Sequence, residues 1–233
     1  MAPIPLVLVP GVGLGPEAWR PTVAALGAGQ SSTVVPLPGY GVRAEPDQDL
    51  SPTALAGRVI TALRSHERVV LLGHSSGCQV AAHAARATPE RLAGLVLIGP
   101  TTDPAASWPR LAGRWLATAR HEDPRQVPSL AQQYTRTGVA TILRAMDAAR
   151  RDRIDRVLAG VACPMLVLRG RHDRICPPAW AAALVRRTRR GTACTLHVGA
   201  HMLPLTHGAA VADRVAAFLR LVGPEDEGSR PPR

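Results

Sequence analysis

Lysine is absent from this 233-residue chain, in which all 28 basic residues are arginines; 17 acidic residues bring the formal net charge to +11. A nucleic-acid-binding surface usually gathers basic residues in a stripe with aromatic side chains between them. Here aromatics make up only 3% of the chain, and the arginines are spread over most of the expected helices. We therefore expect a solvated basic surface and no nucleic-acid partner. Attraction of an anionic substrate or an acidic partner is the alternative.

Patterns typical of metal sites and membrane segments are also missing. The four cysteines show no C-x-x-C spacing and no Cys/His cluster of the kind that binds zinc, so we expect free thiols and no metal. The apolar start of the chain has no positive region before it and is too short to cross a bilayer. These absences predict a cytoplasmic protein without a membrane partner, and they leave its oligomeric state open.

Six short apolar runs recur along the chain and alternate with segments of helical pattern. Runs that are apolar throughout are typical of strands buried on both faces. Their alternation with helices predicts an α/β fold with a mostly parallel, doubly wound sheet. The expected strands are 6–9, 33–37, 69–72, 95–98, 165–168 and 193–198, and the expected helices are 16–26, 52–64, 76–87, 178–187 and 209–221.

The alternation stops over residues 101–163, where no convincing strand occurs. Connections that leave the carboxyl ends of parallel strands border the ligand crevice, so we interpret this segment as a small helical cap. The core is then formed by 1–100 and 164–222, and 223–233 is expected to be a disordered tail. Large side chains of the cap are candidates for substrate contact, namely Trp108, Trp115, Tyr134 and Met146.

The motif with clear chemical content is GHSSG at 73–77, which matches G-x-S-x-G between an expected strand and an expected helix. A sharp turn of this kind exposes the hydroxyl of Ser75. The helix start that follows points free backbone N–H groups at developing negative charge. A turn of small residues matched by chance is the alternative, which the flanking strand and helix disfavour.

In this context the sequence resembles the α/β-hydrolase superfamily, of the single-domain serine esterase type with a helical cap, over nearly the whole chain. The resemblance implies a catalytic triad in the order nucleophile, acid, histidine. His201, within GAHMLPL, matches the general base, and Asp173, within RGRHDRICPP, matches the acid that orients it. Asp103 is the alternative acid. A turn or capping role is the alternative for either aspartate.

The remaining histidines are expected to have structural roles. His197 should lie within the last strand and His207 at the start of the last helix. The side chain of His74 should point away from the neighbouring serine. Surface or packing roles are expected for His66, His83, His121 and His172.

The resemblance also implies an oxyanion hole made of the backbone N–H groups of Val12 and Ser76. Val12 lies in VPGVGLGPEAW after the first strand, where relatives usually carry His-Gly and this chain carries Pro-Gly. A dinucleotide-binding loop is the alternative for the glycines at 11, 13 and 15. Their G-x-G-x-G spacing differs from the G-x-G-x-x-G of that loop.

These residues predict an enzyme, a serine hydrolase that cleaves a carboxylic ester or related acyl bond through an acyl-enzyme on Ser75. The expected partner is a small acyl substrate, and no cofactor is required. Alternatives with the same machinery are a thioesterase, a lactonase or a hydrolase of carbon–carbon bonds. A cyclase, an acyltransferase or a ligand-binding protein on this fold is a further alternative, because fold alone does not fix activity.

Overall fold

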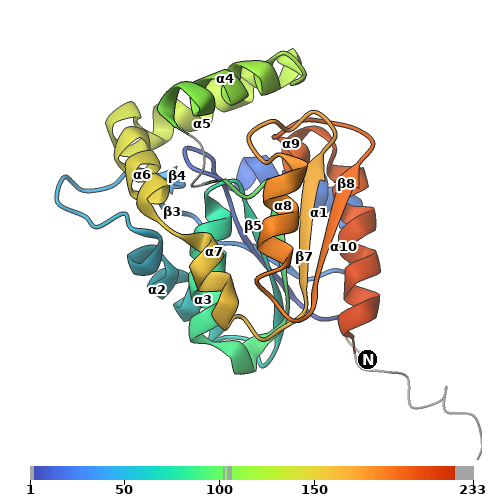
Figure 1. Ribbon diagram of the computed structural model, residues 1–233. Coiled ribbons are helices and arrows are strands. Elements are labelled where there is room, and N and C mark those ends of the chain that lie inside the picture. Colours follow the sequence, from blue (N-terminus) through green and yellow to red (C-terminus); the bar gives the residue numbers. More distant parts are fainter. Residues whose placement is uncertain (1–2, 102, 104–106, 224–233) are drawn as a thin grey trace, which may run out of the picture.

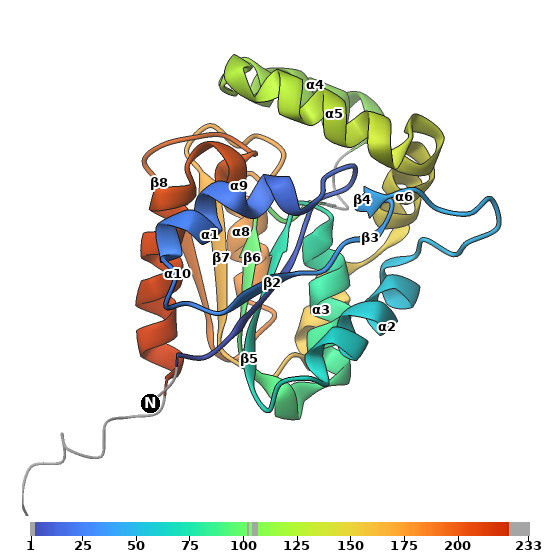
Figure 2. The same ribbon diagram turned by 180° about the vertical axis from the view of Figure 1, so that it is seen from behind.

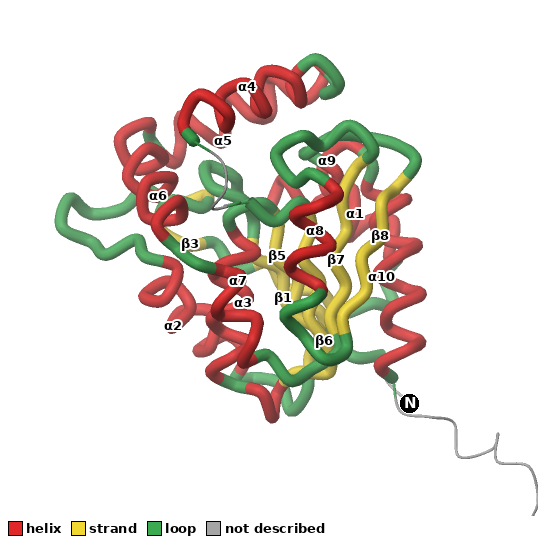
Figure 3. The backbone as a smooth tube through the Cα atoms, in the orientation of Figure 1, coloured by secondary structure: helices red, strands yellow, loops and turns green. Residues whose placement is uncertain are grey.

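The computed structural model describes residues 3–101, 103 and 107–223. Its centre is a six-stranded sheet of order β2-β1-β5-β6-β7-β8, in which neighbouring strands pair in parallel (Figures 1 and 3). This arrangement confirms the predicted fold class. The strands are β1 (Leu6–Val9), β2 (Ser32–Val34), β5 (Val69–His74), β6 (Leu92–Ile98), β7 (Met165–Gly170) and β8 (Gly191–Leu196).

Side chains of the strands alternate between two apolar layers. On β5, Val69 and Leu71 belong to the layer on one face of the sheet, and Val70 and Leu72 belong to the layer on the other face. Successive side chains of a strand point to opposite faces. Because helices cover both faces, both sets are apolar, which explains the unbroken apolar runs in the sequence.

Helices form the two outer layers. One face packs against α2 (Pro52–Leu63), α3 (Gly77–Ala87), α7 (Ile154–Val157) and α8 (Pro178–Val185), and the other packs against α1 (Arg20–Leu26) and α10 (Gly208–Val222). Figure 2 shows α1 and α10 side by side in front of the sheet. Short helical turns complete the described chain, namely η1 (Pro16–Trp19), η2 (Pro89–Arg91), η3 (Pro124–Gln126), η4 (Leu158–Gly160) and α9 (Leu203–Thr206).

The strand order reverses at β1, which is followed in the chain by β2 on one side and then by β5 on the other. In an open parallel sheet, ligands bind outside the carboxyl ends of the strands at such a reversal. The loop after β1 and the turn after β5 border this point. The topology therefore places the GHSSG turn at the expected position of a ligand crevice.

Three helices of the expected cap lie across the carboxyl ends of the strands (Figure 1). They are α4 (Trp108–Ala119), α5 (Val127–Thr137) and α6 (Val139–Arg151). Of these, α5 and α6 lie against the two-stranded element of β3 (Leu37–Pro38) and β4 (Gly41–Val42) and the turn between its strands. After α6 the chain returns to the sheet, where Ile154 and Leu158 are buried in the apolar layer that the sheet shares with α2, α3 and α8. The range 101–163 thus includes residues that pack against α3.

Five of the six expected strands have different bounds in the structure; β5, β6 and β7 are each two or three residues longer than expected, and the other two are displaced. The run 33–37 is divided, because Pro36 has no N–H to donate to a ladder, and β2 ends before it. The run 193–198 is shifted toward the N-terminus, since β8 pairs with β7 from Gly191 to Leu196. His197 therefore lies just after the strand and is exposed, which corrects its expected place within it.

Among the helices that the structure describes, none has the length and apolar character needed to cross a bilayer. The expected tail lies outside the described residues, apart from Gly223.

Truncation of a core residue tests the packing of the sheet. Leu95 of β6 is fully buried, so Leu95→Ala is expected to lower the free energy of unfolding by about 2–5 kcal/mol. Urea denaturation measures the change. The control is Leu221→Ala on α10, where the side chain is 71% exposed and the change should stay within about 0.5 kcal/mol. Equal effects of the two substitutions would contradict this description of the core.

Candidate active site

Ser75 stands in a sharp turn between β5 and α3, with a φ of +55°. This left-handed conformation is uncommon for a residue with a side chain and is held by its surroundings. A Cβ at Gly77 would collide with the carbonyl oxygen of Pro10, and one at Gly73 would lie 2.7 Å from the Cα of Cys78. The two glycines of the motif therefore permit the close approach of α3 and the loop after β1.

Ser75, His201 and Asp173 lie together at the carboxyl ends of β5, β8 and β7. The His201 Nε2 is 2.8 Å from the Ser75 Oγ, and its Nδ1 is 3.0 Å from the Asp173 Oδ2. A carboxylate only accepts hydrogen bonds, so Nδ1–H donates to Asp173 and the neutral Nε2 accepts from the serine hydroxyl. All three side chains are buried, and the structure thus brings together the three residues that the sequence singled out.

Asp173 lies in the tight turn between β7 and α8, residues 171–177, which we call the acid turn. Its Oδ1 accepts hydrogen bonds of 2.9 Å from the backbone N–H groups of Ile175 and Cys176. Burial by itself would raise the pKa of Asp173, but the neighbouring His201, the Cys176 N–H and the charge of Arg169 bring that pKa below its usual value. The carboxylate is therefore charged over the neutral range.

Burial alone would lower the pKa of His201, but Asp173 and a second carboxylate, Glu122, raise it above its usual value. The alternative acid, Asp103, instead accepts a hydrogen bond of 2.8 Å from Arg114 of α4. The carboxylate that contacts the imidazole is Asp173.

His74 contacts the backbone of the other buried histidine. Its Nε2 lies 3.0 Å from the carbonyl oxygen of His201, to which it donates as the neutral tautomer. Burial and the nearby His201 ring lower the pKa of His74 to about 3, so it stays neutral. His74 thus helps to hold the loop between β8 and α9, residues 197–202, which we call the histidine loop. His207 lies at the start of α10, as expected.

The two expected oxyanion donors are adjacent. The N–H of Val12 points at the turn and donates to the Ser76 Oγ over 3.2 Å. Ser76 precedes the first residue of α3, where backbone N–H groups have no partner within the helix. The sequence drew attention to the Ser76 backbone, whereas the contact between its hydroxyl and Val12 is visible only in the structure.

Candidate substrate residues differ in their distance from the triad. The Trp115 ring meets the His201 ring edge-on at 5.8 Å between centroids, and the Tyr134 ring lies against Gly13 in the loop after β1. Met146 is half-buried on α6. The side chain of Trp108 lies outside the described residues.

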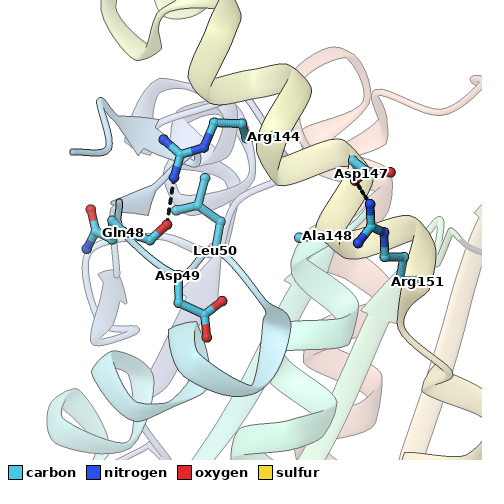
Figure 4. A pocket seen from close by; sticks show the side chains of 7 residues that line it. All are labelled: Gln48, Asp49, Leu50, Arg144, Asp147, Ala148 and Arg151. Carbon is cyan, nitrogen blue, oxygen red and sulfur yellow. Dashed lines mark hydrogen bonds and ion pairs between the residues drawn. The ribbon is translucent and has the colours of Figure 1, made fainter. Parts of the chain in front are cut away.

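A surface pocket near α6 lies apart from these residues (Figure 4). Its lining mixes acidic and basic side chains, and Arg144 donates there to the carbonyl oxygen of Gln48 over 2.7 Å. The lining residues are Gln48, Asp49, Leu50, Arg144, Asp147, Ala148 and Arg151. None of them belongs to the triad.

A family model described as "Alpha/beta hydrolase family" matches residues 6–214. The chain belongs to this family. As an α/β hydrolase, it is an enzyme of the hydrolase class, which confirms the resemblance drawn from its motifs.

Among the curated relatives, this α/β hydrolase is 27% identical to the pimeloyl-[acyl-carrier protein] methyl ester esterase of Pectobacterium carotovorum, over 91% of this chain and 93% of that one. The enzyme of the same name from Edwardsiella ictaluri is also 27% identical, with 87% and 88% covered. Among solved structures, the enol-lactonase of Burkholderia xenovorans superposes with a TM-score of 0.72 at 19% identity, covering 93% of this chain and 92% of that one. The structural likeness shows the fold alone.

Two groups of supporting residues in this hydrolase were missed by sequence reasoning. Arg169 is buried on β7 and donates to the carbonyl oxygens of Asp173 and Cys176 over 2.6 and 2.7 Å. These two hydrogen bonds tie the acid turn to the end of the strand. Thr118 of α4 contacts the acid turn, and Glu122, in the segment after α4, contacts the histidine loop. An isolated arginine in a strand or an isolated glutamate between helices carries no motif that could have identified it.

Arg169→Met tests the support of the acid turn. The variant leaves two buried carbonyl groups without their donor, so the free energy of unfolding is expected to fall by about 2–4 kcal/mol. Labelling of Ser75 by a fluorophosphonate should also become slower, because Asp173 is less firmly placed. Arg171→Met, with an exposed side chain, is the matched control and should resemble the wild type. Unchanged stability and labelling in Arg169→Met would show that the turn is held by other contacts.

Proposed function

We propose that this α/β hydrolase cleaves a carboxylic ester through an acyl-enzyme on Ser75, with His201 as general base and Asp173 as the acid that orients it. The observation that carries the proposal is the continuous hydrogen-bonded chain from the Ser75 Oγ through both ring nitrogens of His201 to Asp173. A serine hydroxyl is a weak nucleophile unless an adjacent base removes its proton. These hydrogen bonds support His201 as that base and fix the tautomer of its ring.

In the first step, the Ser75 Oγ attacks the acyl carbon while its proton passes to Nε2 of His201. The charged carboxylate of Asp173 stabilises the resulting imidazolium. The imidazolium then gives the proton to the leaving alcohol. Water, activated by the neutral imidazole, attacks the acyl-enzyme and releases the acid.

The N–H groups of Val12 and Ser76 are proposed to stabilise the oxyanion. The Val12 N–H bonds to the Ser76 hydroxyl in the free enzyme, so a substrate oxygen has to replace that hydroxyl as the acceptor. Exchange of one acceptor for another keeps the donor satisfied before and after binding.

The ester as substrate class is supported by the names of the relatives from Pectobacterium carotovorum and Edwardsiella ictaluri, which are methyl ester esterases. We propose that Trp115 and Tyr134 contact the substrate, because both lie beside the triad or the loop after β1. Trp108 and Met146 stay weaker proposals. Thioesters, lactones and acyl transfer use the same steps as far as the acyl-enzyme, and a small acyl compound is the partner in each case. The cytoplasmic location and the absence of a cofactor stay predictions.

Removal of the nucleophile is the direct test. Ser75→Ala is expected to lower kcat on p-nitrophenyl esters by about 10⁴-fold or more and to abolish labelling by a fluorophosphonate. Ser65→Ala, at an exposed position just after the end of α2, is the control and should behave as the wild type. A panel of esters, thioesters and lactones then assigns the substrate class. Wild-type rates in Ser75→Ala would overturn the proposal.

The pH profile tests the state of the base. His201 must be neutral to accept the serine proton, and its pKa is raised above the usual 6.5. Activity is therefore lost as the pH falls through a midpoint that lies above 6.5. The pH dependence of kcat/KM on a p-nitrophenyl ester measures this midpoint in the free enzyme. A midpoint below 6.5 would contradict the charge environment described here.

A further inference from the structure

We infer that Glu122 of the cap is a positioning residue for His201. Through Glu122, the docking of the cap on the core sets the geometry and the basicity of the general base. The inference rests on the proposed function, and it concerns a residue that carries no motif. It assigns to the cap a part in catalysis beyond covering the site.

Glu122 reaches from the segment after α4 to the loop that carries the histidine. Its Oε1 accepts hydrogen bonds from the backbone N–H groups of His201 and Met202, over 2.7 and 2.9 Å. Its Oε2 lies 3.2 Å from the Nε2 of Gln126, which holds the carboxylate from the cap side. One carboxylate therefore connects the cap to the base residue itself.

Two backbone N–H groups of the histidine loop, those of His201 and Met202, depend on this contact for their hydrogen bonds. Within the described part of the chain, Glu122 is the acceptor of both N–H groups, while His74 satisfies the carbonyl group of His201 from β5. The loop is thus held on one side by the sheet and on the other by the cap. Buried N–H groups that lose their acceptor are costly, so the loop rearranges when the cap moves away.

The carboxylate also acts on the imidazole through its charge. The ionisable groups that face His201 are Asp173 in the turn after β7, His74 and Ser75 around the end of β5, and Glu122 from the cap. His74 is neutral, so the two carboxylates are the charges that favour the protonated ring. Glu122 contributes to the raised pKa of His201, after burial and Asp173.

Two further contacts come from the same side of α4. The Thr118 Oγ1 accepts a hydrogen bond of 3.0 Å from the N–H of Arg174 in the acid turn, and the Trp115 ring meets the His201 ring. Trp115 and Thr118 are three residues apart and lie on one face of α4, and Glu122 follows in the turn after the helix ends at Ala119. This face of the cap therefore touches both the acid turn and the histidine loop.

The test compares Glu122→Gln with Glu122→Ala. Asp147→Asn on α6 serves as a matched control, because it removes a cap carboxylate that pairs with Arg150 and Arg151 and not with the histidine loop. Glutamine retains an oxygen for the two N–H groups and removes the charge, whereas alanine removes both. The readouts are kcat and KM on a p-nitrophenyl ester, the pH dependence of Ser75 labelling by a fluorophosphonate, and the NMR titration of His201, assigned against His201→Gln.

We expect Glu122→Ala to lower kcat by about 10- to 100-fold with little change in KM, because a displaced catalytic group is costly in rate. Glu122→Gln should recover most of kcat. Both variants should move the acid limb of the profile and the His201 titration to lower pH, since the loss of a negative charge lowers the pKa of the imidazole. Asp147→Asn should leave all three readouts unchanged.

The outcomes separate this inference from the proposed function. If Ser75 of the wild type reacts but Glu122→Gln keeps the wild-type titration and Glu122→Ala keeps its kcat, the positioning role is wrong and the proposed function stands. If Ser75 of the wild type does not react, the proposed function fails and the catalytic role of Glu122 fails with it. If Glu122→Ala does not fold, the titration of Glu122→Gln decides alone.

Discussion

The backbone conformation of Ser75 is the constraint on which the site depends. Its positive φ costs of the order of 1–3 kcal/mol and persists because β5 is fixed before it and α3 begins two residues after it. The loop after β1 closes over the same turn, and Gly77 leaves it the necessary space. Strand pairing thus decides where the hydroxyl points, and the histidine, the acid and the oxyanion donors are arranged around that direction.

Two buried histidines show how the surroundings set basicity. The ring centroids of His74 and His201 are 5.3 Å apart. Nevertheless, the pKa of His74 falls to about 3, while that of His201 rises above its usual value. Burial disfavours the charged form of both. The difference comes from Asp173 and Glu122, which face only His201 closely enough to outweigh its desolvation. One histidine is therefore kept neutral as a hydrogen-bond donor, and the other is suited to accept a proton.

Some of the arginines, which are the chain's only basic residues other than histidine, make hydrogen bonds between distant segments. Arg136 of α5 binds Glu17 after the β1 loop with two hydrogen bonds of 2.7 and 2.8 Å, and Arg144 of α6 donates to two backbone carbonyl groups of the 43–51 segment. Such forked contacts need a planar guanidinium and are not available to lysine. Part of the positive surface expected from the composition thus joins α5 and α6 to segments near the N-terminal half of the sheet.

The sequence alone determined the parallel sheet, the GHSSG turn and its serine, because buried strands leave continuous apolar runs and the motif lies at a strand end. The resemblance to the α/β hydrolases pointed to His201 as the base and to Asp173 or Asp103 as the acid. It left open whether Asp173 or Asp103 meets the histidine, since both follow strands and only their positions in space separate them. The end of β2 was misplaced because Pro36 interrupts the apolar run, and the ends of β8 were misplaced because pairing with β7 sets them. Arg169, His74 and Glu122 came from the tertiary structure only: each acts on backbone groups of another segment, and such a contact requires nothing of the local sequence around either partner.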